Sequence, residues 1–261
     1  MDVSNLFNVK DKVVLISGGG RGIGEMIATG FVAAGAKVYI SSRSAKVIEK
    51  TASELTAMGP GKCFAIAADL QKAEDIKTLV SELSKKEKHL DVLINNSGAT
   101  WGAPIDKYPE EAFLKVVNLN LNSVFLLIQA CLPLLRAGAS SQNPSRIINI
   151  GSINGLLPPS FETYAYSSSK AALHHLTKHL AGRLGKEHIL ANCIAPGTFA
   201  TKMMAGTLKK DGDRILQGTP VGRVGSPEDI AGTCIYLSSR AGAYTTGAVF
   251  AVDGGVLVSK I

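Results

Sequence analysis

The 261-residue chain is 46% hydrophobic and 19% charged, and its 28 Lys and Arg against 21 Asp and Glu give a formal charge of +7. An apolar fraction this high excludes a disordered chain, and the 27 glycines follow no Gly-X-Y period, which excludes a collagen-like one. The cations are scattered, so the excess charge favours a phosphate-bearing ligand or an acidic protein partner over nucleic acid.

Short apolar runs rich in β-branched residues alternate with helical periodicity along the whole chain, which predicts strands and helices in turn. The predicted strands are 13–17, 37–41, 63–67, 91–95, 146–150, 189–194 and 248–252. The predicted helices are 23–34, 45–57, 73–86, 109–136, 164–185 and 227–238, and the polar stretch 202–219 is expected to be a loop that covers the substrate. This alternation predicts one α/β domain over 1–261, a doubly wound Rossmann-type fold with a seven-stranded parallel sheet and helices on both faces.

The four cysteines, Cys63, Cys131, Cys193 and Cys234, lie far apart with no CxxC pair, so we expect buried, reduced thiols. The N-terminus lacks a basic region followed by an apolar core, and no apolar run approaches about 18 residues, so we expect neither a secretory signal nor a membrane span. A cytoplasmic location is expected. The alternative is peroxisomal, because the final Ser259-Lys260-Ile261 differs in one residue from the Ser-Lys-Leu address.

A glycine-rich turn, Ser17 to Gly24, follows the first strand and opens the first helix. This is the position at which a dinucleotide pyrophosphate docks on a helix N-terminus. The glycine spacing is three residues and then one, rather than the commoner GxGxxG, and a plain packing turn is the alternative. The residues expected to contact the cofactor here are Gly18, Arg21, Gly22, Ile23 and Gly24.

The end of the second strand, Ser41-Ser42-Arg43, indicates which cofactor binds. NAD sites usually place a carboxylate there for the ribose 2′-hydroxyl, and this chain has none. Arg43 can form paired hydrogen bonds with a 2′-phosphate, beside Ser42, and Arg21 adds a second cation. The pattern predicts NADP(H); the alternative is that Arg43 is simply a solvated residue.

Polar residues also converge at the carboxyl edge of the predicted sheet, where open α/β sheets bind ligands. Tyr166 and Lys170 are four residues apart and share one helix face, Ser152 follows the fifth strand, and Asn95-Asn96 follow the fourth. Tyr164 is a rival for Tyr166, but its fourth neighbour carries no charge.

Together these segments resemble the short-chain dehydrogenase/reductase family. The glycine turn matches TGxxxGxG with Ser17 for Thr, and Asn95–Gly98 matches NNAG with Ser97 for Ala. The other matches are Asn120 in Asn120–Phe125, chosen over Asn118 by register, the catalytic Ser152, Tyr166-x-x-x-Lys170, the PGxxxT segment Pro196–Thr201, and the closing Asp253–Gly255. Within the family the chain is similar to the 3-oxoacyl-thioester (acyl-carrier-protein) reductases, including the rhamnolipid-associated type.

The resemblance implies a role for each matched residue. Tyr166 would donate the proton, with its pKa lowered from about 10 by the Lys170 ammonium and the positive nicotinamide ring of the oxidised cofactor, and Ser152 would bind the carbonyl oxygen. Lys170 would also hold the nicotinamide ribose, and Asn120 a water of the proton relay. Cofactor contacts are implied for Asp69, Leu70, Asn96, Tyr166, Lys170, Pro196, Gly197, Phe199 and Thr201. Ser152 lies 14 residues before Tyr166 where 13 are expected, which puts the shape of the 156–159 loop in question.

The favoured function is an NADPH-dependent reductase of a 3-oxoacyl thioester or another apolar ketone. Met203, Met204 and Leu208 suit an apolar chain, and Lys209 and Lys210 a phosphopantetheine or an acidic carrier. The alternatives are an NADP-dependent alcohol or polyol dehydrogenase and, from another class, a non-catalytic cofactor-binding regulatory protein.

We expect no metal, because His175 and His179 have the spacing of ligands but no third partner. The two long helices at 109–136 and 164–185 are more apolar than one solvated face needs, and relatives often pair these helices. We therefore expect a homodimer or homotetramer.

Overall fold

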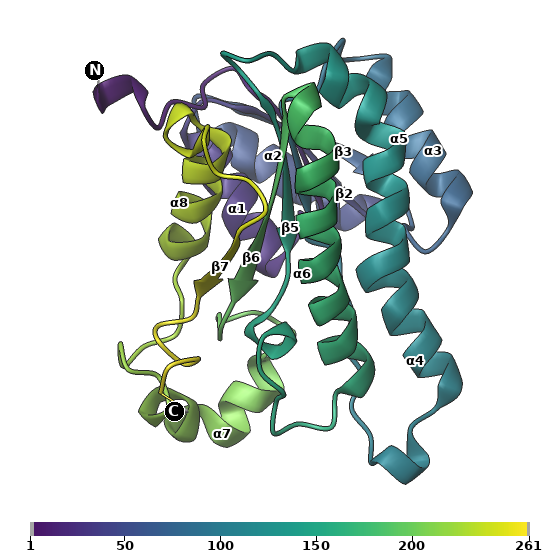
Figure 1. The fold of residues 1–261 in the computed structure, drawn as a ribbon, viewed down its shortest axis with the longest axis vertical. Coiled ribbons are helices and arrows are strands. Elements are labelled where there is room, and N and C mark those ends of the chain that lie inside the picture. The colour runs from purple at the N-terminus through teal and green to yellow at the C-terminus, as the bar shows by residue number, and fades with distance from the viewer. Residues whose placement is uncertain (1–2, 260–261) are drawn as a thin grey trace.

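A computed structural model describes residues 3–259 (Figure 1). Seven strands form one parallel sheet in the order β3-β2-β1-β4-β5-β6-β7. The strands are β1 (Val13–Ser17), β2 (Lys37–Ser42), β3 (Lys62–Ala67), β4 (Val92–Asn95), β5 (Ser145–Ile150), β6 (Ile189–Pro196) and β7 (Val249–Val252). β1, β4, β5 and β6 are buried along their whole length, as expected of a sheet covered on both faces. The predicted fold class is confirmed.

Two helical layers cover the sheet and bury two apolar clusters (Figure 1). One layer consists of α1 (Gly22–Ala33), α2 (Ala45–Met58) and α8 (Pro227–Ser238), and the other of α3 (Ala73–Ser84), α5 (Ser123–Gly138) and α6 (Tyr164–Leu184). In the first layer Phe31 and Ile230 are fully buried against the sheet, and in the second Leu79 and Leu127 are. The four cysteines are free and buried, as predicted, two on strands of the sheet and two on helices that cover it.

The strand order reverses at β1, which pairs with both β2 and β4. Ser17 at the end of β1 lies opposite Ser41 on one side and Asn95 on the other. At such a switch point the segments leaving neighbouring strands diverge to opposite faces and open a crevice at the carboxyl edge. The topology therefore places the glycine turn and the Asn95-Asn96 pair next to each other at this edge.

The helix predicted over 109–136 is interrupted. α4 (Glu110–Val117) runs into a π-helical turn, Asn118–Asn122, and then into α5. A π turn inserts one residue into the α-helical period and rotates the side chains that follow. The buried residue of this turn is Asn120.

By length and composition alone, the helical stretch Glu110–Gly138 is long and apolar enough to cross a membrane, which the sequence did not lead us to expect. Its inner face is buried: Val124, Leu127, Cys131 and Leu135 belong to the core cluster that also contains residues of α3 and α6. These contacts are those of a core helix.

The expectation that 202–219 is a loop is wrong. Ala205–Gln217 forms helix α7, kinked at Asp211, at the end of the molecule toward which β6 and β7 point (Figure 1). Gly206 and Gly212 weaken the helical signal in the sequence, which explains the error. No residue of α7 is buried. The final tripeptide lies partly outside the described residues, since the structure describes Ser259 but not Lys260 or Ile261.

Candidate active site

The glycine turn requires glycine for two separate reasons. Gly18 and Gly22 have φ of +68° and +57°, a region that other residues rarely adopt. A side chain at Gly24 would place its Cβ 2.3 Å from the Gly18 carbonyl oxygen. Helix α1 begins at Gly22 with no side-chain cap, so its first N–H groups face the crevice and suit a phosphate.

Asn96 holds this turn in place. Its amide nitrogen donates to the carbonyl oxygens of Ser17 and Gly18, at 3.0 and 3.1 Å. The Ser17 hydroxyl in turn accepts from the backbone nitrogens of Asn96 and Ser97. The ends of β1 and β4 are therefore locked together, and Asn96 uses its amide nitrogen on the turn itself.

The residues at the end of β2 fit a 2′-phosphate. Ser41 is tied to the turn, since the Gly18 nitrogen donates to its carbonyl oxygen at 2.7 Å. Arg43 follows directly, and both Arg43 and Arg21 are exposed. Within residues 3–259 neither arginine has an ion-pair partner, so both guanidinium groups are free to bind an anion.

The PGxxxT segment closes the other end of the crevice. The Gly197 nitrogen donates to the Val252 carbonyl oxygen at 2.9 Å, which joins the segment to β7. Thr201 reaches the glycine turn, because a Cβ at Gly22 would lie 3.3 Å from its methyl group. Pro196 is buried at the end of β6.

Phe199 and Leu70, two residues predicted to contact the cofactor, bury their side chains in the apolar core. The Phe199 ring is 2% exposed and packs against Gly225, where a Cβ would lie 2.4 Å from the ring. Leu70 is 6% exposed and belongs to the core, whereas the neighbouring Asp69 is half-buried at the end of β3. Any cofactor contact from Phe199 or Leu70 is therefore left to the backbone.

The four predicted catalytic residues do meet. The Ser152 hydroxyl hydrogen-bonds to the Tyr166 hydroxyl. Lys170 lies on the same face of α6, with Nζ 5.7 Å from the centre of the Tyr166 ring. Its ammonium donates to the Ile150 carbonyl oxygen at 2.7 Å. Ser152, two residues after that carbonyl, is thus fixed relative to the helix that carries Tyr166, despite the extra residue in the intervening loop.

Asn120 completes the group from the π-helical turn. Its side chain exchanges two hydrogen bonds with the backbone of Ala99, at 2.9 and 3.0 Å, and donates to the Ser169 hydroxyl at 3.0 Å. A Cβ at Gly98 would lie 3.3 Å from Asn120 Oδ1 and 3.7 Å from Lys170 Nζ. The NNAG-like segment therefore packs directly between Asn120 and Lys170.

Burial is the largest influence on the pKa values of Tyr166 and Lys170, the two titratable residues among the predicted catalytic four. It raises the pKa of Tyr166, an effect that the Ser152 hydrogen bond partly offsets, and lowers the pKa of Lys170 to about 8. In the chain without its cofactor, burial therefore outweighs the Ser152 hydrogen bond at Tyr166. The lowering of this pKa by Lys170 together with the nicotinamide ring stays a prediction.

The alternative residues considered in the sequence lie away from the predicted catalytic group or on the surface of α6. Tyr164 is 37% exposed, and its hydroxyl faces Glu162 rather than a cation. His175 and His179 are exposed on α6. Among residues 3–259, no three His, Cys, Asp or Glu side chains gather where a metal could bind.

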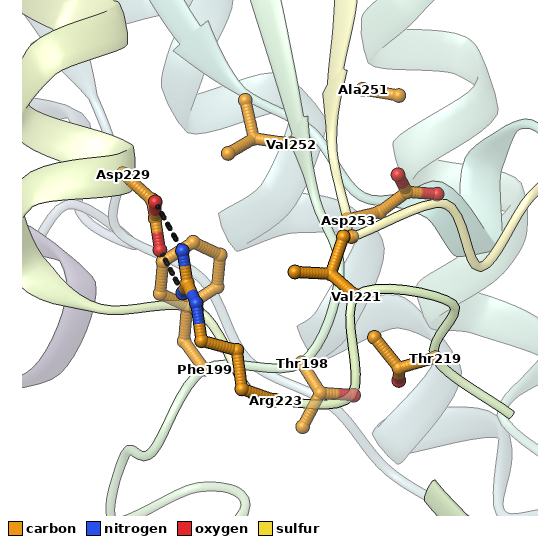
Figure 2. Close-up of a pocket in the computed structure, with 11 residues that line it drawn as sticks. Thr198, Phe199, Thr219, Val221, Arg223, Asp229, Ala251, Val252 and Asp253 are labelled. Carbon is orange, nitrogen blue, oxygen red and sulfur yellow. Dashed lines mark hydrogen bonds and ion pairs between the residues drawn. The ribbon is translucent and has the colours of Figure 1, made fainter. Parts of the chain in front are cut away.

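A cavity of about 260 Å³ lies behind the PGxxxT segment, between β7 and the chain that leads from α7 to α8 (Figure 2). Arg223 and Asp229 form a two-pronged ion pair at its wall, with nitrogen–oxygen distances of 2.5 and 3.0 Å. This pair and the Ser226 capping box of α8 share the Asp229 carboxylate. None of the four predicted catalytic side chains lines this cavity.

Two features of the site escape the sequence patterns. The π-helical turn leaves no periodic signal, because a single inserted residue alters only one turn of an otherwise apolar helix. His174, buried on α6 one turn after Lys170, reads in the sequence as one of a run of helix residues, yet its ring touches the Ser152 backbone.

Comparisons with known proteins agree on the family. A family model described as "Enoyl-(Acyl carrier protein) reductase" matches residues 18–257. The rhamnolipids biosynthesis 3-oxoacyl-(acyl-carrier-protein) reductase of Pseudomonas aeruginosa is 44% identical over 255 residues, which cover 95% of this chain and 97% of that protein. The 2-dehydro-3-deoxy-D-gluconate 5-dehydrogenase of Bacillus subtilis is 36% identical over 260 residues, 96% of each chain.

A solved structure, the Pseudomonas aeruginosa RhlG/NADP active-site complex, superposes with a TM-score of 0.93 at 43% identity and covers 97% of this chain and 99% of that one. The sheet order, the motifs and these matches lead to one conclusion. The chain belongs to the short-chain dehydrogenase/reductase family of oxidoreductases.

Proposed function

We propose that the protein is an NADPH-dependent reductase that converts a 3-oxoacyl thioester, or a similar apolar ketone, into the corresponding alcohol. The observation that carries this proposal is the convergence of Ser152, Tyr166 and Lys170 at the carboxyl edge, with hydroxyl joined to hydroxyl. A relative 44% identical carries a 3-oxoacyl-(acyl-carrier-protein) reductase name, which supports the substrate class.

NADP(H) is the cofactor that the residues favour. Two exposed arginines, Arg21 and Arg43, flank the turn, and no carboxylate stands at 41–43. Gly18, Gly22, Ile23 and Gly24 would receive the pyrophosphate, Ser42 with Arg43 the 2′-phosphate, and Asp69 the adenine. The structural neighbour whose title names NADP supports the same choice.

In the proposed reaction NADPH, when bound, supplies the hydride for the carbonyl carbon. Ser152 donates a hydrogen bond to the carbonyl oxygen and places it against Tyr166. The Tyr166 hydroxyl transfers its proton to that oxygen as negative charge develops. The raised pKa of Tyr166 keeps its hydroxyl protonated before the reaction, as a proton donor requires, and Lys170 stabilises the phenolate that forms. Asn120 holds the water through which the proton is replaced.

Exposed apolar side chains around the site favour an apolar substrate over a polyol. Trp101, Leu156, Phe161 and Met203 are 49%, 42%, 52% and 55% exposed. Leu156 and Phe161 come from the loop that precedes Tyr166, Trp101 from the segment whose Ala103 nitrogen donates to the Glu162 carbonyl oxygen, and Met203 leads into α7. Burying such side chains against an acyl chain stabilises the complex.

A substrate panel tests this proposal. NADPH absorbance is followed with 3-oxoacyl thioesters of increasing length, and NADP+ reduction with polyols and sugar acids. We expect turnover of the thioesters and little of the sugar acids. Turnover of sugar acids alone would instead support the dehydrogenase function carried by the name of the Bacillus subtilis relative.

We also propose that the protein is a homodimer or homotetramer. Phe113, Leu114, Phe125 and Leu126 are exposed along α4 and α5, outside the buried face of that helix pair. A second copy would cover them. A light-scattering mass of two or four chains is expected, and a mass near 27 kDa would contradict it. The cytoplasmic location stays a prediction, consistent with the four free thiols.

A further inference from the structure

His174 is a buried histidine that the catalytic scheme above does not use. It lies on α6 four residues after Lys170, and it is 5% exposed. Its Nε2 accepts a hydrogen bond, 3.4 Å long, from the backbone nitrogen of Ser152. The ring therefore contacts the backbone of a residue that we place against the substrate oxygen.

The two glycines near Ser152 leave room for this ring. A Cβ at Gly151 would lie 2.3 Å from His174 Nε2, and a Cβ at Gly155 would lie 2.8 Å from its Cε1. Ser152 is held between them at the start of the short 3₁₀ turn Ile153–Gly155. The backbone of the loop that carries Ser152 therefore packs closely against the His174 imidazole.

Lys170 and His174 each form a hydrogen bond with the backbone next to Gly151, one on either side of it. The Lys170 ammonium donates to the carbonyl oxygen of Ile150, and the His174 ring accepts from the nitrogen of Ser152. Both side chains come from one helix, on successive turns of the same face. Because Tyr166 lies one turn earlier on this face, the helix fixes Ser152 and Tyr166 relative to each other.

The remaining ring nitrogen argues against a purely packing role. Since Nε2 accepts, the neutral ring carries its proton on Nδ1. Nδ1 is buried and has no partner at normal hydrogen-bond distance among the described residues, and the nearby Gly155 backbone only partly offsets its burial. An unsatisfied buried nitrogen costs stability, so an apolar side chain of similar size would pack better if packing were the whole role. Burial and the nearby Lys170 hold the pKa of His174 near 4, which keeps the accepting form.

We propose that His174 is a positioning residue: it fixes the Ser152 backbone so that the hydroxyl meets both Tyr166 and the substrate oxygen. The proposal rests on the proposed role of Ser152 in reduction. It assigns His174 no proton transfer and no contact with the substrate.

A double-mutant cycle between His174 and Ser152 tests the proposal. His174→Leu removes the acceptor, and we expect kcat for a 3-oxoacyl thioester to fall about tenfold with the NADPH dissociation constant unchanged. In a Ser152→Ala background the same change should cost less than about twofold, because there is no longer a hydroxyl to position. His174→Gln, whose side-chain oxygen can accept from the Ser152 nitrogen, should recover part of the loss.

His175→Leu, on the exposed side of the same helix, is the matched control and should leave kcat unchanged. Should His174→Leu not fold, His174→Met replaces it, since a thioether fills irregular space and accepts hydrogen bonds only weakly. Equal losses in both backgrounds, or full activity in a folded His174→Leu variant, would overturn the positioning role. If Ser152→Ala itself cost nothing, the proposed function would be at fault instead.

Discussion

The edge that carries the proposed catalytic residues, here called the catalytic edge, and helix α7, the proposed substrate cover, lie at the same end of the sheet (Figure 1) but differ in how they are packed. Ser152 and Lys170 are 6% and 4% exposed, whereas no residue of α7 is buried. The catalytic side chains are held by backbone carbonyls, glycine contacts and each other. The cover has an apolar stripe and a kink at Asp211 but no core of its own.

We infer from this difference that the rigid edge carries out the reaction and that the exposed cover selects the substrate. Groups that must meet within a fraction of an ångström lie on elements that cannot move without disturbing the core. A cover with no fully buried residue in the free chain can close on chains of different length at little cost, because closing breaks few buried contacts. Changes at the edge should therefore alter kcat, and changes in the cover should alter KM.

The largest effect is expected at the edge. Ser152→Ala removes the hydrogen bond to the developing oxyanion, and we expect kcat to fall roughly 10²–10³-fold. The hydroxyl lies outside the proposed cofactor contacts, so the NADPH dissociation constant, measured by fluorescence, should not change. If Ser152→Ala also weakened NADPH binding, the hydroxyl would contribute to cofactor binding as well as to the reaction, contrary to this prediction.

Arg43→Asp tests the cofactor end of the same edge. It replaces a charge-assisted pair with a like-charge repulsion, so the NADPH/NADH ratio of kcat/KM should fall roughly 10–100-fold. Arg223→Asp is the control, since that cation lies behind the PGxxxT segment and is paired with Asp229. An unchanged ratio in the Arg43 variant would remove the basis for NADP(H) preference.

The rigidity of the edge should also appear in its acid stability. Burial first, and then Lys170 and Lys178 on α6, lower the pKa of His174 to about 4 from 6.5. Between these pH values the unfolded chain binds a proton that the folded chain does not, so stability falls as pH falls from 6.5 towards 4. His174→Gln should remove about 1–3 kcal/mol of this dependence. The free energy of unfolding is measured with denaturant at pH 7 and pH 4.5. If it fell by the same amount between these pH values in both proteins, a buried neutral ring would be contradicted.

The smallest effects are expected in the cover. Leu208→Ser removes apolar surface that is half-buried on α7, and KM for long-chain thioesters should rise a few-fold with kcat and melting temperature nearly unchanged. Lys209→Gln on the same helix is the control for charge. A large loss of kcat or of stability from Leu208→Ser would show that α7 is part of the catalytic framework.

The same contrast explains what the sequence could predict. The strands are predictable from their continuous apolar runs, and the shared helix face of Tyr166 and Lys170 follows from their spacing alone. The helical state of 205–217 was missed because Gly206 and Gly212 obscure the periodicity. The inward turn of Phe199 depends on the absence of a side chain at Gly225, 26 residues away in the chain. The pKa of Tyr166 depends on burial, which no local pattern encodes.

The most direct test of the proton-donor assignment is the reduction of a 3-oxoacyl thioester by Tyr166→Phe, followed by NADPH absorbance beside the unchanged protein. The variant keeps the ring and loses the proton, so we expect turnover to fall at least roughly 10²–10⁴-fold while NADPH still binds. Near-normal turnover in a folded, NADPH-binding Tyr166→Phe variant would contradict the account.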